Sequence, residues 1–242
     1  MRLLDLLLPP TCAACGSSGW PLCGACTDRV GVITPPWCQR CGRPWEEPLT
    51  SCADCPSRVI DVARAPFLYR GPLARAVRGM KFSGWHALGT PLAAAMSQVA
   101  GDLLPADAVT WVPLSTRRLR RRGFDQAEVL ARALGKSLDL PVRCLLVRRR
   151  DTPAQARKGG AERRRALEGA FEPTDGAGGT ILLVDDVLTT GATAAACVRA
   201  LRRGGAARVS LLTAARSLGG PVPARCRGPS GRLGTRRTGR VP

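Results

Sequence analysis

The amino-acid sequence predicts an α/β protein in which a parallel-sheet domain is preceded by a small cysteine-rich domain. From residue 59 onward, short apolar runs alternate with segments of helical periodicity, as expected for strands that are buried between helices on both faces. Before that point, eight of the eleven cysteines form four C-x-x-C pairs. We therefore divide the 242 residues into a cysteine-rich domain (1–58), an α/β domain (59–217) and a basic tail (218–242), which we expect to be disordered because it is rich in Gly, Pro and Arg.

The cysteine pairs predict two structural zinc sites. Two residues between two thiols place both sulfurs on one ion, so four pairs supply two tetrathiolate sites with no ligand position left open for catalysis. A disulfide framework would need an oxidising compartment, and no secretory signal is recognisable. Sequential pairing is the simplest arrangement, and a cross-braced one is the alternative. The expected ligands are Cys12, Cys15, Cys23 and Cys26 for one ion and Cys38, Cys41, Cys52 and Cys55 for the other.

The elements of the α/β domain follow from apolar periodicity and capping signals. Apolar residues at helical spacing predict a helix over 73–80. Thr90 followed by Pro91 predicts the N-cap and first turn of a second helix, which extends through Leu103. Strands are then expected at 108–112, 142–147, 180–186 and 207–214, with helices over 129–138 and through Val198 and Leu201 to a stop at Gly204.

Charge and composition limit the classes of function that this protein can have. The net charge of +19 divides into 0 for residues 1–58, +13 for 59–217 and +6 for 218–242, which favours a polyanionic partner for the central domain and tail. Because arginine outnumbers lysine 34 to 3, nucleotide bias is a competing explanation. A single histidine, His86, argues against Ser-His-Asp and Cys-His catalysis. No apolar run is long enough to span a membrane, and we expect a cytoplasmic protein.

Residues 181–193, ILLVDDVLTTGAT, predict the binding site. Four apolar residues deliver Asp185 and Asp186 to the end of a buried strand, where ligands of parallel α/β sheets bind. The chain then turns into a helix through a segment whose hydroxyls and free N–H groups suit a phosphate. Two diol-binding carboxylates beside a phosphate cradle describe a ribose 5-phosphate site. The alternative is that the Asp pair only caps the helix. The expected phosphate-binding residues are Thr189, Thr190, Gly191, Ala192 and Thr193.

This segment resembles the ribose-phosphate signature of type I phosphoribosyltransferases, and the whole chain resembles the ComF/GntX family of bacterial competence and DNA-utilisation proteins. The opening LLDLLLPPTCAACG, the block YRGPLARAVRGMKF with Lys81 and Phe82, the block VPLSTRRLRRRGFDQAEVLAR, and the segments DTPAQ and RRRALEGAF carry the resemblance. It implies a type I phosphoribosyltransferase-like domain behind a double zinc ribbon, with PRPP and Mg²⁺ as ligands.

The resemblance also implies where the diphosphate of PRPP lies. The loop after the first core strand and the arginines behind it should hold that group, and a mobile loop between 148 and 170 should close over the ribose. Asp125 stands where the family usually has Asn and adds a negative charge beside the loop. The carboxylate that serves 6-oxopurines is replaced by Thr189, which argues against hypoxanthine or guanine as acceptor. The implied diphosphate residues are Pro113, Leu114, Ser115, Thr116, Arg117, Arg118, Arg121 and Arg122.

Two functional hypotheses follow. In the first, the protein binds PRPP with Mg²⁺ and transfers or senses a 5-phosphoribosyl group in competence, DNA uptake or nucleotide salvage, with Asp185 and Asp186 stabilising an oxocarbenium-like transition state. In the second, a non-enzymatic ComF-type component handles single-stranded DNA during transformation by mainly electrostatic contacts. A competence protein docked on the zinc module and a second copy of this chain are the further partners that we consider.

Overall fold

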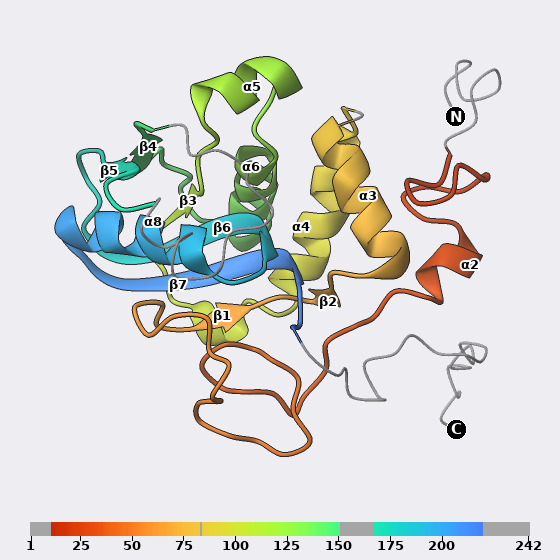
Figure 1. The fold of residues 1–242 in the computed structure, drawn as a ribbon, viewed down its shortest axis with the longest axis horizontal. Coiled ribbons are helices and arrows are strands. Elements are labelled where there is room, and N and C mark those ends of the chain that lie inside the picture. The colour runs from red at the N-terminus through yellow and green to blue at the C-terminus, as the bar shows by residue number, and fades with distance from the viewer. Residues whose placement is uncertain (1–10, 83, 151–166, 220–242) are drawn as a thin grey trace, which may run out of the picture.

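The computed structural model describes residues 11–82, 84–150 and 167–219. Its main sheet is parallel throughout, with the order β1-β7-β6-β3 and with β2 also paired to β7 (Figure 1). The parallel sheet confirms the predicted fold class. The strands are β1 (Ala63–Arg64), β2 (Phe67–Leu68), β3 (Ala108–Trp111), β6 (Gly179–Leu188) and β7 (Ala206–Arg216).

Helices cover both faces of this sheet because the central strands are apolar on both sides. Along β6, Leu182 and Val184 pack into one apolar cluster, whereas Ile181 and Leu183 pack into the other. The first cluster contains side chains of three helices, and the second contains those of α8 (Ala192–Arg203). The three helices on the first face are α3 (Gly71–Phe82), α4 (Gly89–Ser97) and α6 (Gln126–Leu138).

The second helix differs from its prediction at both ends. A 3-10 turn, η1 (His86–Leu88), runs directly into α4, so Leu88 is the N-cap and Thr90 already lies inside the helix. Pro91 therefore sits in the first turn, where a missing N–H costs no hydrogen bond. The helix ends at Ser97 instead of continuing to Leu103, which belongs to a separate 3-10 turn, η2 (Gly101–Leu103), and is still buried in the core.

The strand expected at 142–147 is wrong in extent and in pairing. Its residues touch the main sheet only through a bridge between Val142 and Val109. The chain then leaves the sheet and forms β4 (Leu146–Arg148), which pairs antiparallel with β5 (Phe171–Pro173). The short strands β1 and β2 and the helix α5 (Thr116–Arg122) were not predicted, because each has too few residues to show a periodic pattern.

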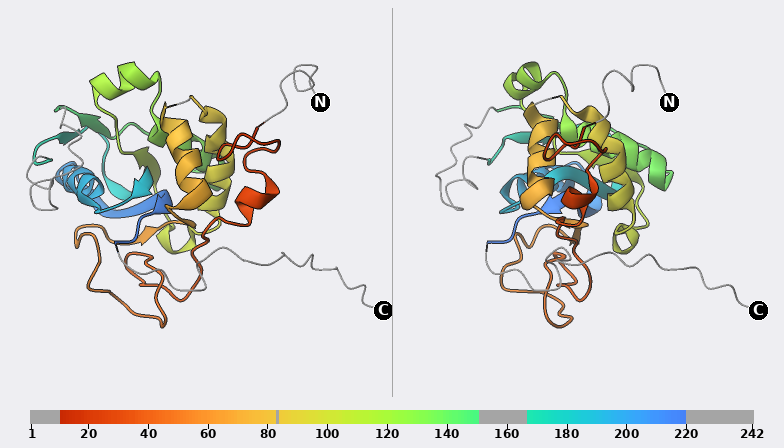
Figure 2. Two further views of the ribbon diagram at one scale, coloured as in Figure 1. Left: turned by 45° about the vertical axis from the view of Figure 1, so that its right-hand side comes forward. Right: turned by 90° about the vertical axis from the view of Figure 1, so that its right-hand side faces the viewer.

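The cysteine-rich segments lie at two different places on this domain. The first, which contains α2 (Gly24–Thr27), lies beside α3, and the second lies below β1 in the views of Figures 1 and 2. Within the described ranges, no helix combines the length and the apolar character needed to cross a bilayer. Apart from residues 218 and 219, the predicted basic tail falls outside the described residues.

Candidate functional site

Asp185 and Asp186 lie where β6 loses one of its two neighbours. The pairing of β3 with β6 ends at Trp111 and Val184, whereas β7 accompanies β6 to Leu188. The carboxylates therefore stand just beyond the end of β3, at an open edge of the sheet. Because side chains alternate along a strand, Asp185 shares the α8 face with Leu183, and Asp186 shares the opposite face with Val184.

Lys81 neutralises the second of these carboxylates. It belongs to the last turn of α3, and its Nζ atom lies 2.8 Å from Oδ2 of Asp186, whose side chain is 7% exposed. A buried carboxylate without a partner would be costly, so the ion pair explains how Asp186 is tolerated. In the sequence, Lys81 stood out only as part of a segment that resembles the family, and its ion pair with Asp186 was not predicted. This ion pair is hard to predict from sequence because its two residues are 105 positions apart.

Burial and the neighbouring charge hold Asp185 largely protonated at neutral pH. Desolvation and, to a smaller extent, the charge of Asp186 raise the pKa of Asp185 to about 8, although Lys81 opposes both effects. Its Oδ1 accepts a hydrogen bond of 2.8 Å from the backbone N–H of Asp186. The pair therefore consists of one carboxylate in an ion pair and one carboxyl group that a nearby positive charge would favour in its ionised form.

The predicted diphosphate loop follows β3 and leads into α5. The backbone N–H of Val112 bonds to Val184, and the chain then leaves the sheet, with Ser115 as N-cap of α5. This helix stands at the top of the molecule in Figure 1. Its basic residues fall into two groups. Arg117, Arg120 and Arg121 are exposed, whereas Arg118 and Arg122 are half-buried.

Arg122 is the arginine of α5 that turns toward the carboxylates. Burial lowers its pKa, and the charge of Asp186 opposes this change. Its Nη1 donates to Oε1 of Gln126 at 2.8 Å, and its guanidinium lies 5.3 Å from the ring centroid of Phe82, which follows Lys81 in α3. The site thus brings together cationic groups from two helices and two carboxyl groups from a strand.

Asp125 fixes the diphosphate loop to α6. As the N-cap of that helix, its Oδ1 accepts from the N–H of Ala127 at 2.9 Å, and its Oδ2 accepts from the N–H of Leu114 at 2.7 Å. Burial raises the pKa of Asp125 to about 6, and these hydrogen bonds oppose the change. From the sequence, Asp125 is expected only to add a negative charge beside the loop. Its side chain is in fact committed to two backbone groups, one of which belongs to the loop.

The predicted ribose-phosphate loop connects β6 to α8. Thr189 and Thr190 are exposed, and the hydroxyl of Thr190 accepts from the N–H of Ala192 at 3.5 Å. Gly191 is the N-cap of α8 and has a φ of +70°, a conformation that favours glycine. The first N–H groups of a helix have no carbonyl one turn earlier, so this end of the 12-residue α8 offers donors to an anion.

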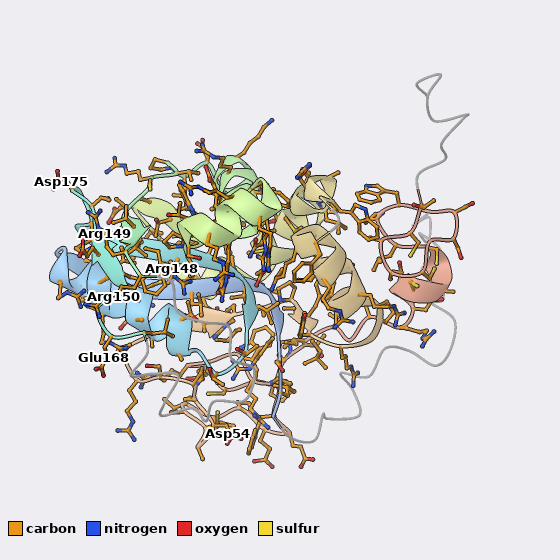
Figure 3. All side chains as sticks on the ribbon, turned by 45° about the horizontal axis from the view of Figure 1, so that its top comes forward. Asp54, Arg148, Arg149, Arg150, Glu168 and Asp175 are labelled. Carbon is orange, nitrogen blue, oxygen red and sulfur yellow. The ribbon has the colours of Figure 1, made fainter. Side chains whose placement is uncertain are left out.

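The expected mobile loop falls mostly outside the described residues, which omit 151–166. Its two flanks are joined by the β4-β5 pairing, and an ion pair of 2.7 Å links Arg149 to Glu172. Arg148 lies over the ring of Phe171, with 5.2 Å between its guanidinium carbon and the ring centroid. Figure 3 shows the side chains on either side of the omitted segment: Arg148, Arg149, Arg150 and Glu168.

The eight paired cysteines gather into two clusters in sequential order. Within each cluster the four Sγ atoms lie within 4.8 Å of one another. The Sγ atoms of Cys15 and Cys23 are 3.6 Å apart, and those of Cys41 and Cys52 are 3.5 Å apart. A tetrahedral Zn²⁺ with Zn–S bonds of about 2.3 Å requires sulfurs about 3.8 Å apart, so the clusters fit structural zinc. The cross-braced alternative is not the arrangement found.

Comparison with known proteins places this arrangement in a family. Residues 3–56 match the double zinc ribbon domain, and residues 119–225 match the phosphoribosyl transferase domain. The chain is 31% identical over 234 residues to the DNA utilization protein YhgH of Salmonella typhimurium, a match that covers 88% of this chain and 100% of that protein. The chain belongs to the ComF family.

A second ComF relative is competence protein ComFC of Bacillus subtilis, which is 31% identical over 217 residues, covering 81% of this chain and 84% of that protein. Competence protein F of Haemophilus influenzae is 27% identical over 209 residues, covering 81% and 90%. Among solved structures, glutamine PRPP amidotransferase of B. subtilis with ADP and GMP matches 52% of this chain and 26% of its own, at 22% identity and a TM-score of 0.38. The matches to YhgH, to ComFC and to the two domain families confirm the ComF family, which the sequence motifs had predicted.

Proposed function

We propose that this ComF protein binds PRPP together with Mg²⁺ at the open end of β6 and transfers or senses its 5-phosphoribosyl group. The observation that carries this proposal is the meeting of the Asp185–Asp186 pair with Lys81 and Arg122 beside two loops that suit phosphates. Carboxylates recognise the ribose diol, and the cations balance the charge of the diphosphate. The names of two relatives, a DNA utilization protein and a competence protein, support a role for this chemistry in the handling of DNA or of its nucleotides.

Each part of the ligand has residues suited to it. The 5-phosphate lies against the loop from Thr189 to Thr193, and the diphosphate lies between the loop after β3 and Arg122. In a transfer reaction, the bond from C1 of the ribose to the diphosphate oxygen breaks, diphosphate leaves, and the acceptor forms a new bond to C1. Asp185 and Asp186 then stabilise the positive charge that develops on the ribose. Asp185 and Asp186 are the residues that would help to hold Mg²⁺ with the ligand, and the ion would supply positive charge to neutralise the diphosphate.

Replacing Arg122 by Gln tests the diphosphate part of the site. The variant is expected to bind PRPP about tenfold more weakly, because it loses a charge-assisted hydrogen bond to the leaving group, and to bind ribose 5-phosphate within about twofold of the unmodified protein. Calorimetric titration with both ligands measures the difference. Arg120→Gln, on the exposed side of the same helix, is the matched control and should change neither affinity. Equal weakening for both ligands would contradict the placement of Arg122.

Ligand binding should also depend on pH through Asp185. Because burial raises the pKa of Asp185 to about 8, the empty site holds a proton there at pH 7. A ligand that needs the carboxylate must displace this proton, so affinity rises with pH, by about eightfold between pH 7 and 8.5. This range, from pH 7 to 8.5, lies above the second pKa of a phosphate group, which is about 6. Titrations across it should show this rise, which Asp185→Asn should abolish. An affinity that falls with pH would contradict the assignment.

A second candidate function is the binding of single-stranded DNA. The exposed side of α5 carries Arg117, Arg120 and Arg121, with Leu119 beside them and Phe82, 66% exposed, on the adjoining helix end. Contact of these three arginines with three phosphates predicts that log K falls against log salt with a slope of about −2. Fluorescence anisotropy with a labelled oligonucleotide measures this slope. Tight binding that does not change with salt would rule out an interaction of this kind.

A further inference from the structure

The second cysteine cluster is joined to the end of β7 by a buried arginine. Arg216, the last residue of β7, is 3% exposed, and its Nη1 donates to the backbone carbonyl of Cys41. Its Nη2 donates to the Sγ atom of the same cysteine at 3.4 Å. A donor to a zinc-ligating thiolate orients the ligand and tunes its hold on the metal. Arg216 therefore links the cluster directly to the sheet.

The same cluster is fixed to β1 by backbone contacts. The N–H of Ala63 donates to the carbonyl of Arg40 at 2.8 Å. Gly42 has a φ of +66°, and a Cβ atom there would lie 2.7 Å from the carbonyl oxygen of Ala63. The knuckle between Cys38 and Cys41 thus fits against the sheet with no room for a side chain. Movement of this knuckle would disturb the strands that support it.

From this cluster, two contacts reach the ribose-phosphate loop, one at each of its ends. Pro56, which follows Cys55, packs closely on Gly191. A Cβ atom added at position 191 would lie 2.6 Å from the Cβ atom of Pro56. Ser217, which follows Arg216, donates its N–H to the carbonyl of Leu188 at 2.8 Å. Both ends of the loop are therefore held by residues adjacent in sequence to groups of the zinc cluster.

The first cysteine cluster makes different contacts. Its segment packs on α3, where Nε of Arg75 donates to the carbonyl of Ala14 at 2.9 Å, and where Ala13 and Val30 join the core beside that helix. Within the described residues, no backbone hydrogen bond and no close glycine contact joins this cluster to the loop between Leu188 and Ala192. The first cluster can therefore serve as an internal control for the effect of the second cluster on the loop.

We propose that Pro56 and Arg216 are positioning residues through which zinc in the second cluster holds the ribose-phosphate loop in its binding conformation. This inference rests on the function proposed above. Because coupling between two sites is reciprocal, a ligand on the loop must in turn retain zinc in the second cluster and leave the first unaffected. The second zinc ribbon is then part of the ligand site, although its metal touches no ligand.

Zinc release from the unmodified protein tests this coupling without a mutation. Two equivalents of zinc are released to an excess of a chromogenic chelator, with and without saturating ribose 5-phosphate. Release of one equivalent should slow at least about fivefold with the ligand, and release of the other should not change. Arg216→Met should accelerate release of the same equivalent about tenfold, whereas Arg75→Met, beside the first cluster, should not affect it.

Pro56→Gly tests the loop contact itself. The variant should retain two zinc equivalents and bind ribose 5-phosphate about tenfold more weakly, whereas Pro48→Gly, at an exposed position between Cys41 and Cys52, should bind within twofold of the unmodified protein. Ligand that binds normally to Pro56→Gly, with zinc release from both clusters insensitive to it, would overturn the inference and leave the proposed function standing. A zinc-loaded unmodified protein that binds neither ribose 5-phosphate nor PRPP would overturn both.

Discussion

The Asp185→Asn/Asp186→Asn variant is expected to lose PRPP binding by about 100-fold or more. Each substitution removes a charged acceptor for a ribose hydroxyl, and a hydrogen bond to a charged group contributes about 1.5–3 kcal/mol. The loss also leaves Lys81 beside an amide instead of a carboxylate, so the ion pair of 2.8 Å disappears. Calorimetric titration with PRPP and Mg²⁺ measures the loss, with zinc content and thermal melting recorded for each protein.

A matched control removes one carboxylate elsewhere. Asp175 is exposed in the turn after β5, and Figure 3 shows it at the edge of the molecule. Asp175→Asn should bind PRPP as the unmodified protein does, because it changes the net charge without touching the site. If the double variant keeps two zinc equivalents and binds PRPP with unchanged affinity, the carboxylates do not contact the ligand, and the assignment of the ribose site is wrong.

Loss of zinc from the second cluster is expected to unfold more of the protein than loss from the first. A structural zinc site contributes about 10 kcal/mol or more, which is comparable to the whole stability of a domain. The second cluster also holds β1, β7 and the ribose-phosphate loop through Ala63, Arg216 and Pro56. Cys52→Ser should therefore lower the melting temperature and abolish PRPP binding.

The comparison variant for this prediction is Cys23→Ser, which removes one ligand from the first cluster. It should release one zinc equivalent and loosen the segment on α3, yet retain measurable PRPP binding, because its contacts are with Arg75 and the start of that helix. Circular dichroism, melting and zinc content are compared for the two variants. Equal losses of PRPP binding in both would show that the clusters do not differ in their relation to the site.

The elements that carry the site were predictable because their signals are local. A run of four apolar residues before Asp185 predicts β6, and the glycine at 191 followed by apolar spacing predicts α8. The C-x-x-C spacing likewise predicts the cysteine clusters, since a knuckle needs only neighbouring residues. In each case the residues that determine the structure lie within about one turn or one strand of one another.

The features that could not be predicted from the sequence depend on contacts between segments that are distant along the chain. An apolar run such as VRCLLV fits a parallel or an antiparallel strand equally well, so the pairing of β4 with β5 could not be predicted from it. Lys81 reaches Asp186 because α3 packs beside the open end of β6, and Arg216 reaches Cys41 across 175 positions of sequence. Only the packed structure brings such side chains together.

The central claim is that the open end of β6 binds PRPP, and titration of PRPP with Mg²⁺ into the zinc-loaded protein at pH 8 tests it most directly. The account predicts a single site per chain, tighter binding of PRPP than of ribose 5-phosphate, and release of protons as Asp185 ionises. A folded protein that retains two zinc equivalents and shows no heat of binding for either ligand would contradict the claim.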